Sequence, residues 1–189
     1  MGFGSIVVLA LFAFVAITIF KGVRIVPQGY KWIVQRLGKY HTTLNPGLNF
    51  VIPYVDEVAY KTTTKDIVLD IPSQEVITRD NAVLVMNAVA YINITTPEKA
   101  VYGIENYSWA IQNLVQTSLR SIVGEMDLDD ALSSRDHIKA KLKAAISEDI
   151  SDWGITLKTV EIQDIQPSST MQSAMEAQAA AERQRRATV

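Results

Sequence analysis

VLVMNAVAYINI, residues 83–94, is the stretch that decides the fold. It is apolar at both odd and even positions, which is typical of a central β-strand covered on both faces. RDNA, residues 79–82, precedes it and predicts a hairpin turn from SQEVIT, residues 73–78. Thr96 and Pro97 follow it and predict the start of a helix. Strands therefore give way to helices here, which predicts a mixed α/β fold.

The residues before this strand follow a mostly two-residue apolar period from Val23 onward, interrupted by turn residues. This period predicts strands at 31–37, 57–63 and 66–71, with Pro72 ending the last of them. The residues after it follow the helical period. Helices are predicted at 97–103, 108–124 and 133–154, each ending at a glycine. A strand at 155–165 follows, and its apolar parity changes between Leu157 and Val160, which predicts a bulge.

Residues 2–20 carry no charged side chain, and the first cations are Lys21 and Arg24. As a helix this run is about 28 Å long, close to the roughly 30 Å of hydrocarbon in a bilayer. A cleaved signal peptide would need basic residues before the run, so an uncleaved single span is favoured. Because the cations follow it, the rest of the chain is predicted to be cytoplasmic and the N-terminus outside. The predicted anchor side chains are Phe3, Ile6, Val7, Leu9, Leu11, Phe12, Phe14, Ile17 and Phe20.

The segment NPGLNFVIPY, residues 45–54, is rich in apolar side chains between two prolines. Leu48, Phe50, Ile52 and Tyr54 share one parity, so one face of the segment is strongly apolar. The period alone favours a strand that faces the core. The prolines remove donors that a central strand would need, and the nearby span keeps the segment near lipid. Two interpretations stay open, a strand that faces the core and a surface that contacts lipid. We predict a mixed role, in which the segment closes its subdomain and residues 50–54 help to seat it on a membrane.

The composition gives little sign of chemistry. The chain has no cysteine, which excludes disulfides and thiol catalysis, and its net charge of −2 gives no overall attraction for nucleic acid. His41 and His137 lack the spacing of a zinc site. The acidic stretch EMDLDD, residues 125–130, fits a helix start better than a metal site. Phosphate loops and nucleophile elbows are absent from the sequence, so no catalytic residue, cofactor or metal is predicted.

The last segment, residues 167–189, predicts the start of a coiled-coil helix. Met171, Met175, Gln178 and Glu182 recur at spacings of four, three and four, which makes one stripe. The basic group near the end could contact nucleic acid, but acids among its neighbours favour a solvated helix face. The predicted oligomer interface consists of Met171, Met175, Gln178, Glu182, Arg183, Arg185 and Arg186.

Eight motifs in order resemble one known family, the SPFH (band 7, prohibitin-homology) family, and within it the bacterial stomatin-like paraslipins. The motifs are IVPQGY (25–30), RLGKY (36–40), LNPGLNFVIPYVDEV (44–58), VLDIPSQEVITRDN (68–81), LVQTSLRSIVGEMDLDDALSSRD (114–136), DWGI (152–155), VEIQDIQP (160–167) and AERQRR (181–186). The resemblance covers essentially the whole chain after the apolar run.

This resemblance implies a membrane-anchored scaffold without catalysis. It implies an SPFH domain in two subdomains, residues 21–95 with mostly strands and residues 96–166 with helices and a returning strand. It also implies a large homo-oligomeric ring or cage that organises a patch of a bacterial inner membrane. The implied partners are the lipid bilayer and an AAA-type membrane protease or an NfeD-like membrane protein. A membrane-tethered hydrolase and a monomeric lipid- or protein-binding adaptor are the alternatives.

Overall fold

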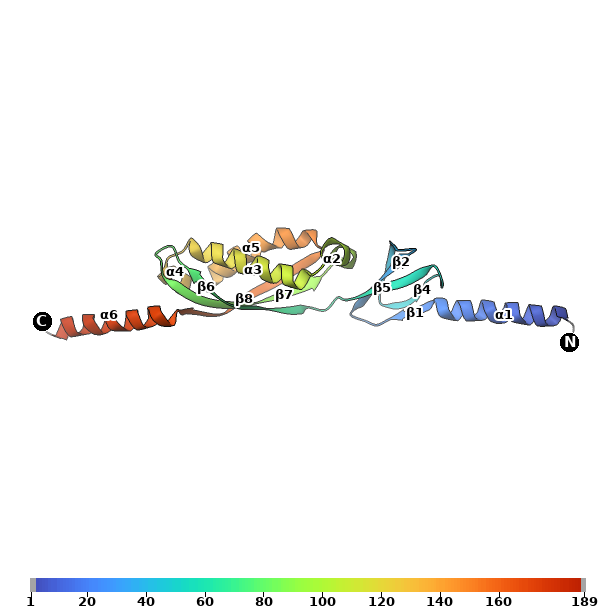
Figure 1. Ribbon diagram of the computed structural model, residues 1–189, viewed down its shortest axis with the longest axis horizontal. Helices are drawn as coiled ribbons and strands as arrows, with labels where there is room; N and C mark the ends of the chain where they lie inside the picture. The colour runs from blue at the N-terminus through green and yellow to red at the C-terminus, as the bar shows by residue number, and fades with distance from the viewer. Residues whose placement is uncertain (1–2, 188–189) are drawn as a thin grey trace. The chain divides into compact units, whose positions relative to one another are not determined.

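A computed structural model describes residues 3–187, apart from the side chains of residues 3, 5, 6, 182 and 185–187. The chain forms two compact units (Figure 1). Unit 1 consists of Met1–Lys65 and Ile94–Glu105, and unit 2 consists of Asp66–Asn93 and Asn106–Val189. The mixed α/β fold predicted from the sequence is confirmed.

Unit 1 combines a long helix with two small antiparallel sheets. The sheets have the strand orders β1-β4 and β3-β2-β5. Its core is a cluster of buried valines and a leucine against which Trp32 and Val58 pack. The elements of unit 1 are α1 (Phe3–Gly22), β1 (Val23–Val26), β2 (Tyr30–Arg36), β3 (Lys39–Leu44), β4 (Gly47–Phe50), β5 (Asp56–Thr63) and α2 (Pro97–Gly103).

Unit 2 is a three-stranded sheet with helices on one face. The strand order is β6-β7-β8, α3 packs on β6, and α5 packs on β8 and on α3 (Figure 1). The helices supply fully buried isoleucines and leucines to the core, because these recur at spacings of three and four. The elements are β6 (Ile67–Ile77), β7 (Val83–Ile94), α3 (Tyr107–Gly124), α4 (Leu128–Ser133), α5 (Arg135–Asp152), β8 (Ile155–Pro167) and α6 (Ser169–Ala187).

The stretch 83–94 forms the central strand β7, as predicted. All of its even-numbered side chains from Leu84 to Ile94 are buried. The opposite face is only partly covered, since Val83, Val85 and Tyr91 are half-buried. The helices lie on one face of this sheet only (Figure 1), so the prediction of cover on both faces holds for one of them.

Pro72 does not end a strand, contrary to the prediction. Strand β6 continues through it from Ile67 to Ile77, with a register shift against β7 between Ile71 and Gln74. A proline fits there because β6 is an edge strand and the irregular pairing asks for no donor from that residue. The side chains of β8 change parity as the sequence indicates, since Leu157 and Val160 are both buried, and the bulge there stays a prediction.

The division into units differs from the subdomain boundary expected between residues 95 and 96. Strands β6 and β7 belong with the helices of unit 2, because the helices pack on the buried face of the sheet that these strands form. The short helix α2 belongs instead with unit 1, where it packs on β2 and β3.

His41, expected in a loop, lies on β3 and is exposed.

Candidate functional site

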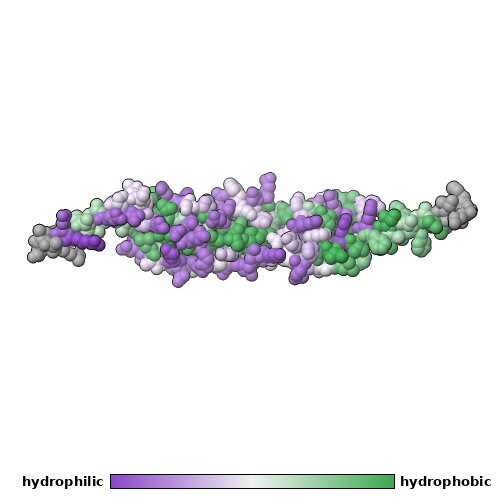
Figure 2. Space-filling model, turned by 90° about the horizontal axis from the view of Figure 1, so that it is seen from below, coloured by the Kyte–Doolittle hydropathy of each residue, from purple (hydrophilic) through white to green (hydrophobic). Residues whose placement is uncertain are grey.

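Helix α1 exposes apolar side chains along its length. The run of residues 2–20 is helical from Phe3, and Figure 2 shows the helix as a mostly green surface. Within the part of the chain that the structure describes, no helix is both long and apolar enough to cross a membrane. Phe3 and Ile6, two predicted anchors, have side chains outside the described part. The other predicted anchors are all exposed: Val7, Leu9, Leu11, Phe12, Phe14, Ile17 and Phe20.

A second exposed apolar surface lies on β1, β4 and the loop after β4. β1 follows α1 without an intervening residue and pairs with β4, which sets Ile25 opposite Leu48 and Val23 opposite Phe50. The two-stranded sheet has no third strand, so the side chains on its outer face find no cover within unit 1 among the described residues. We call Ile25, Leu48, Phe50, Ile52 and Tyr54 the apolar edge.

The structure answers which face of the segment 45–54 is buried. Leu48, Phe50, Ile52 and Tyr54 are all more than half exposed, whereas Val51 between them is in the core cluster of unit 1. These four residues therefore do not face the core, which was one of the two open interpretations. The side chains of the apolar parity therefore point outward, and only Val51, of the opposite parity, packs into the core cluster among the residues of this segment.

The end of α1 is fixed to the loop after β4. The Val51 N–H donates a hydrogen bond to the Gly22 carbonyl at 2.8 Å. A Cβ on Gly22 would stand 2.8 Å from the Val51 carbonyl oxygen, so the two backbones approach as closely as a glycine allows. The ammonium of Lys21 lies 5.6 Å from the centre of the Tyr54 ring. The positive flank of α1 thus meets the apolar edge.

An ion pair holds this loop in place. Arg36 donates two hydrogen bonds to the Asp56 carboxylate, at 2.6 and 3.0 Å, and the Ile52 N–H donates a third at 2.9 Å. The Arg36 guanidinium, through these hydrogen bonds, lowers the pKa of Asp56 to about 2. The Asp56 side chain is 3% exposed. Its position fixes the turn in which Tyr54 sits.

Two exposed residues near this surface were missed by sequence reasoning. Leu37, at the tip of the β2–β3 hairpin, is 84% exposed with a φ of 50°, and its N–H donates to the Val55 carbonyl. Ile25 belongs to the apolar edge through its pairing with β4. In the sequence, only the position of Leu37 beside Gly38 in a turn indicates that its side chain is exposed. No such indication exists for Ile25, because its exposure depends on the pairing of β1 with β4.

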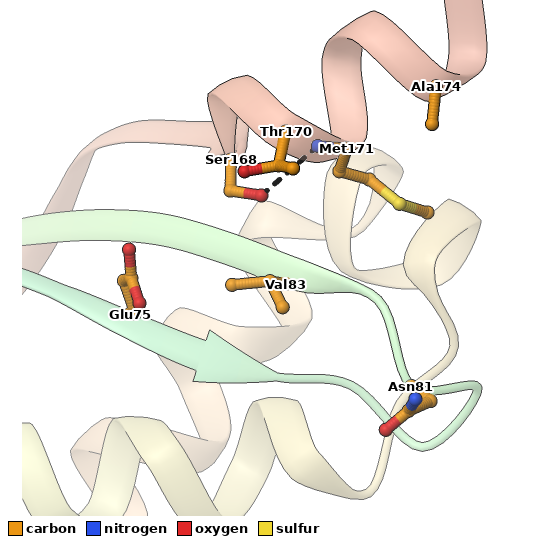
Figure 3. Close-up of a pocket in the computed structure, with 7 residues that line it drawn as sticks. All are labelled: Glu75, Asn81, Val83, Ser168, Thr170, Met171 and Ala174. Atoms are coloured by element: carbon orange, nitrogen blue, oxygen red, sulfur yellow. Dashed lines mark hydrogen bonds between the residues drawn. The ribbon is translucent and has the colours of Figure 1, made fainter.

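Helix α6 carries the residues predicted to contact other copies. Met171 lines a groove of about 510 Å³ with Glu75, Asn81 and Val83 (Figure 3), whereas Met175 lines a different groove with Pro167. The Ser168 hydroxyl caps the helix by accepting the Met171 N–H at 3.3 Å. Gln178 and Arg183 are exposed, and the side chains of Glu182, Arg185 and Arg186 lie outside the described residues. The two methionines therefore do not share one groove within a single chain.

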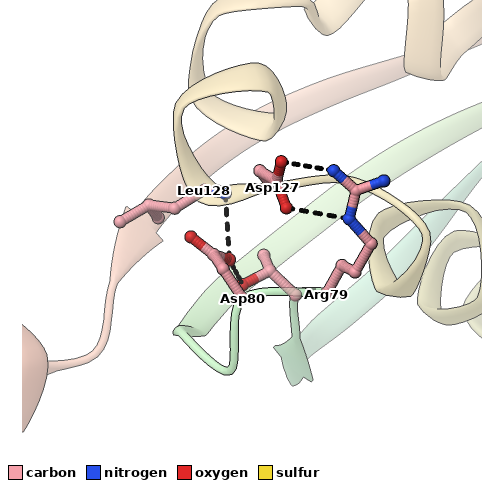
Figure 4. A network of polar contacts seen from close by, with 5 residues as sticks. Arg79, Asp80, Asp127 and Leu128 are labelled. Carbon is pink, nitrogen blue, oxygen red and sulfur yellow. Dashed lines mark hydrogen bonds and ion pairs between the residues drawn. The ribbon is translucent and has the colours of Figure 1, made fainter.

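The helix start predicted in the acidic stretch 125–130 is confirmed, but the side chain that caps it lies elsewhere in the sequence. Helix α4 begins there, but Asp127 pairs with Arg79 in the β6–β7 turn instead of capping the helix. The cap comes from that turn, since the Asp80 carboxylate accepts the Leu128 N–H at 3.1 Å (Figure 4). A hydrogen bond from Thr78 is the largest of the effects that lower the pKa of Asp80.

The remaining chemistry-bearing residues do not gather into a site in the described chain. His41 and His137 are exposed and lie in different units. Among the described residues, no three histidine or carboxylate side chains come together as metal ligands. The features that stand out are therefore surfaces: α1, the apolar edge with its two cations, and the exposed helix α6.

An apolar helix followed by a two-unit mixed α/β domain is the class that this fold defines. The family model of the SPFH domain / Band 7 family matches residues 24–189, and the chain belongs to this family.

Three relatives illustrate the range of matches. Human "Stomatin-like protein 2, mitochondrial" is 39% identical over 164 residues, covering 87% of this chain and 46% of that protein. An uncharacterised protein of Mycobacterium tuberculosis strain H37Rv is 36% identical over 186 residues, covering 98% of this chain and 49% of that protein. The chain thus spans about half the length of these two curated relatives. An uncharacterised protein of Methanocaldococcus jannaschii is 40% identical over 182 residues, 96% of this chain and 88% of its own length.

Proposed function

We propose that the protein is a membrane-associated scaffold without catalytic activity, whose copies assemble side by side on a bilayer. The observation that carries this proposal is the continuity of α1 with the apolar edge of unit 1. Both are exposed, both are apolar, and the Val51–Gly22 hydrogen bond fixes one to the other. Their membership in one surface suits a lipid partner, because exposed apolar patches in soluble proteins are usually small.

In this proposal α1 attaches the chain to the membrane and unit 1 lies next to the lipid. Lys21 and Arg24 directly follow the apolar run, and such cations favour the cytoplasmic side of a bacterial inner membrane. Tyr54 at the same level suits the headgroup layer, where aromatic side chains with a polar end are enriched. The single-pass topology with the N-terminus outside is part of the proposal.

Assembly follows from attachment in a plane. Anchored copies meet at a high effective concentration, so weak lateral contacts suffice to hold them together. Helix α6 supports this step because it is exposed along most of its length, and an isolated helix of its size is only marginally stable in water. The interface is proposed to use Met171, Met175, Gln178, Glu182, Arg183, Arg185 and Arg186.

A ring or cage built in this way would enclose and organise a patch of membrane. An AAA-type membrane protease or an NfeD-like membrane protein is the proposed partner, on the family resemblance alone. The name of the human relative, stomatin-like protein, supports this proposal at the level of the family. The proposal covers only the half of the human and mycobacterial relatives that this chain matches.

The hydrolase alternative finds no supporting observation in the described residues. Asp56, Asp80 and Glu161 have a lowered pKa, caused mainly by hydrogen bonds from Arg36, Thr78 and Lys139 respectively. Such carboxylates are ionised and already hydrogen-bonded at neutral pH. Groups of this kind stabilise the fold, whereas a general acid would need a raised pKa.

Membrane attachment is tested by vesicle flotation of the full chain. The double variant Leu11→Asp and Phe12→Asp should lose flotation, because two charges in the middle of an apolar helix oppose insertion. The matched control is Val68→Asp, which places a charge on an exposed apolar position of unit 2. Equal flotation of the double variant and the wild type would contradict the proposed attachment.

Assembly is tested by the particle size of the full chain in mild detergent and in native membrane patches. The wild type should form one large species. Met171→Asp with Met175→Asp should reduce its size, while Ser173→Asp on the same helix should not, since the Ser173 hydroxyl donates only to the Ser169 and Thr170 carbonyls of its own helix. A monomeric wild type would instead support the adaptor alternative.

A further inference from the structure

A recess lies where α1 ends and the loop after β4 begins. Its volume is about 440 Å³, and all of its lining belongs to unit 1. The lining residues are Lys21, Arg24, Val51, Pro53, Tyr54 and Asp56. Two cations, a phenol and one carboxylate therefore converge at the end of an apolar helix.

The carboxylate does not neutralise the two cations. Asp56 is held by both arms of the Arg36 guanidinium and by the Ile52 N–H, and its side chain is almost fully buried. In the described chain no carboxylate comes within ion-pair distance of Lys21 or Arg24. Because Arg36 balances Asp56, the recess carries a net positive charge. Both cations are exposed and can receive an anion from outside.

Tyr54 is held beside these cations in an unusual conformation. Its φ is 73°, a left-handed backbone that residues other than glycine seldom adopt. The turn is fixed on both sides, since the Asp56 N–H donates to the Ile52 carbonyl at 2.9 Å and the Ile52 N–H donates to the Asp56 carboxylate. Tyr54 as a whole is 70% exposed and so gains little from burial. A strained, exposed tyrosine next to a lysine suggests a role in contact with a ligand.

We propose that this recess binds the phosphate group of an anionic phospholipid headgroup. The forked donors of Arg24, the ammonium of Lys21 and the hydroxyl of Tyr54 match the oxygens of a phosphate. The site rests on the proposed function, because α1 would bring the recess to the headgroup layer. Helix C-termini disfavour anions, but Lys21 in the last turn offsets this effect and the Gly22 carbonyl is already hydrogen-bonded to Val51.

Such a site gives unit 1 a second attachment point beside the helix. A helix alone leaves the unit free to rotate about the helix axis. A headgroup held by Lys21 and Arg24 fixes that rotation and turns the apolar edge toward the lipid. The protein would consequently prefer membranes rich in anionic lipid, and that preference can be measured apart from attachment itself.

The test measures lipid binding to the full chain in neutral detergent by native mass spectrometry. Phosphatidic acid is the probe, and phosphatidylcholine is the comparison lipid. The wild type should retain phosphatidic acid more strongly. Lys21→Gln and Arg24→Gln should each weaken this binding about tenfold, as expected for the loss of a charged hydrogen-bond donor. Tyr54→Phe, which removes only the hydroxyl, should give a smaller loss.

Lys65→Gln is the matched control. Lys65 is an exposed lysine of the same unit whose ammonium lies 5.7 Å from the centre of the Tyr30 ring, so it repeats the lysine–tyrosine pair outside the recess. Binding by this variant should equal that of the wild type. Equal losses for Lys65→Gln and Lys21→Gln would overturn the proposal, because the effect would then be one of overall surface charge. Wild-type binding by both recess variants would overturn it as well.

Two further results separate the possible sources and the two proposals. Inorganic phosphate should not displace phosphatidic acid at matched concentration; displacement would mean a site for free phosphate and would overturn the lipid assignment. Flotation of the full chain on neutral vesicles tests attachment separately. Flotation without any preference for phosphatidic acid contradicts the recess alone. Lipid preference in detergent without flotation supports the recess and contradicts the proposed attachment.

Discussion

Replacing Gly22 with alanine should loosen the junction between α1 and the loop after β4. Gly22 is the last residue of α1, and a Cβ there would meet the Val51 carbonyl oxygen at 2.8 Å. Real Cβ atoms do not approach a carbonyl that closely, so the loop must move. The movement strains the hydrogen bond from the Val51 N–H to the Gly22 carbonyl, which is 2.8 Å long in the structure.

The expected magnitude follows from three contributions. Loss of the hydrogen bond costs about 1 kcal/mol, and the forced displacement of a packed loop costs about 1–3 kcal/mol. Alanine returns up to about 1 kcal/mol because it favours the helix more than glycine does. The closed junction should therefore lose about 1–4 kcal/mol, which corresponds to an equilibrium constant for opening that is about 5- to 900-fold larger.

Hydrogen exchange of the Val51 amide in the full chain measures this equilibrium. Gly103→Ala is the matched control: Gly103 is also the last residue of a helix in unit 1, and a Cβ there would meet no atom within 4 Å. Exchange at Val51 should accelerate in Gly22→Ala and stay unchanged in Gly103→Ala. Unchanged exchange in Gly22→Ala would refute the close approach on which the recess depends.

Three more predictions concern stability. The lowered pKa of Asp56, about 2 against about 4 in an unfolded chain, means that its contribution is present above pH 4 and lost as the pH falls toward 2. Asp56→Asn should therefore flatten the acid unfolding curve of the protein in that range, followed by circular dichroism. Asp80→Ala removes the cap of α4 and should lower the midpoint of urea unfolding of unit 2, and Asp80→Asn, which keeps an acceptor, should lower it by less. Ile146→Ala, at a fully buried position, should cost about 2–5 kcal/mol, whereas Ile77→Ala, at a position 56% exposed, should cost under about 1 kcal/mol in the same assay.

The sequence predicted most of the elements because their signals are local. The both-sided apolar run of β7, the proline at the start of α2 and the glycine after α5 act within a few residues of themselves. The strand end predicted at Pro72 was wrong because a proline is tolerated there only if β6 is an edge strand, and edges are set by pairing with distant residues. The cap of α4 was missed for the same reason: Asp80 is remote from Leu128 in the chain.

The candidate site was predictable in part. Periodicity placed Leu48, Phe50, Ile52 and Tyr54 on one face, but it could not say whether that face was covered. Cover depends on how many strands join β1 and β4, and they form a sheet of only two. The two cations after the apolar run were found from their position, whereas the meeting of Lys21 with Tyr54 depends on the fold of the loop between them.

Unit 1 is built from two separate stretches, Met1–Lys65 and Ile94–Glu105, so the polypeptide passes from one unit to the other three times. A protease that cuts at any one crossing produces two fragments that only non-covalent contacts hold together, because each unit draws on chain from both sides of most crossings. Neither unit can be excised as one continuous piece. Transplanting unit 2 into another protein would require a short artificial bridge from Asn93 to Asn106 in place of the excised α2 segment.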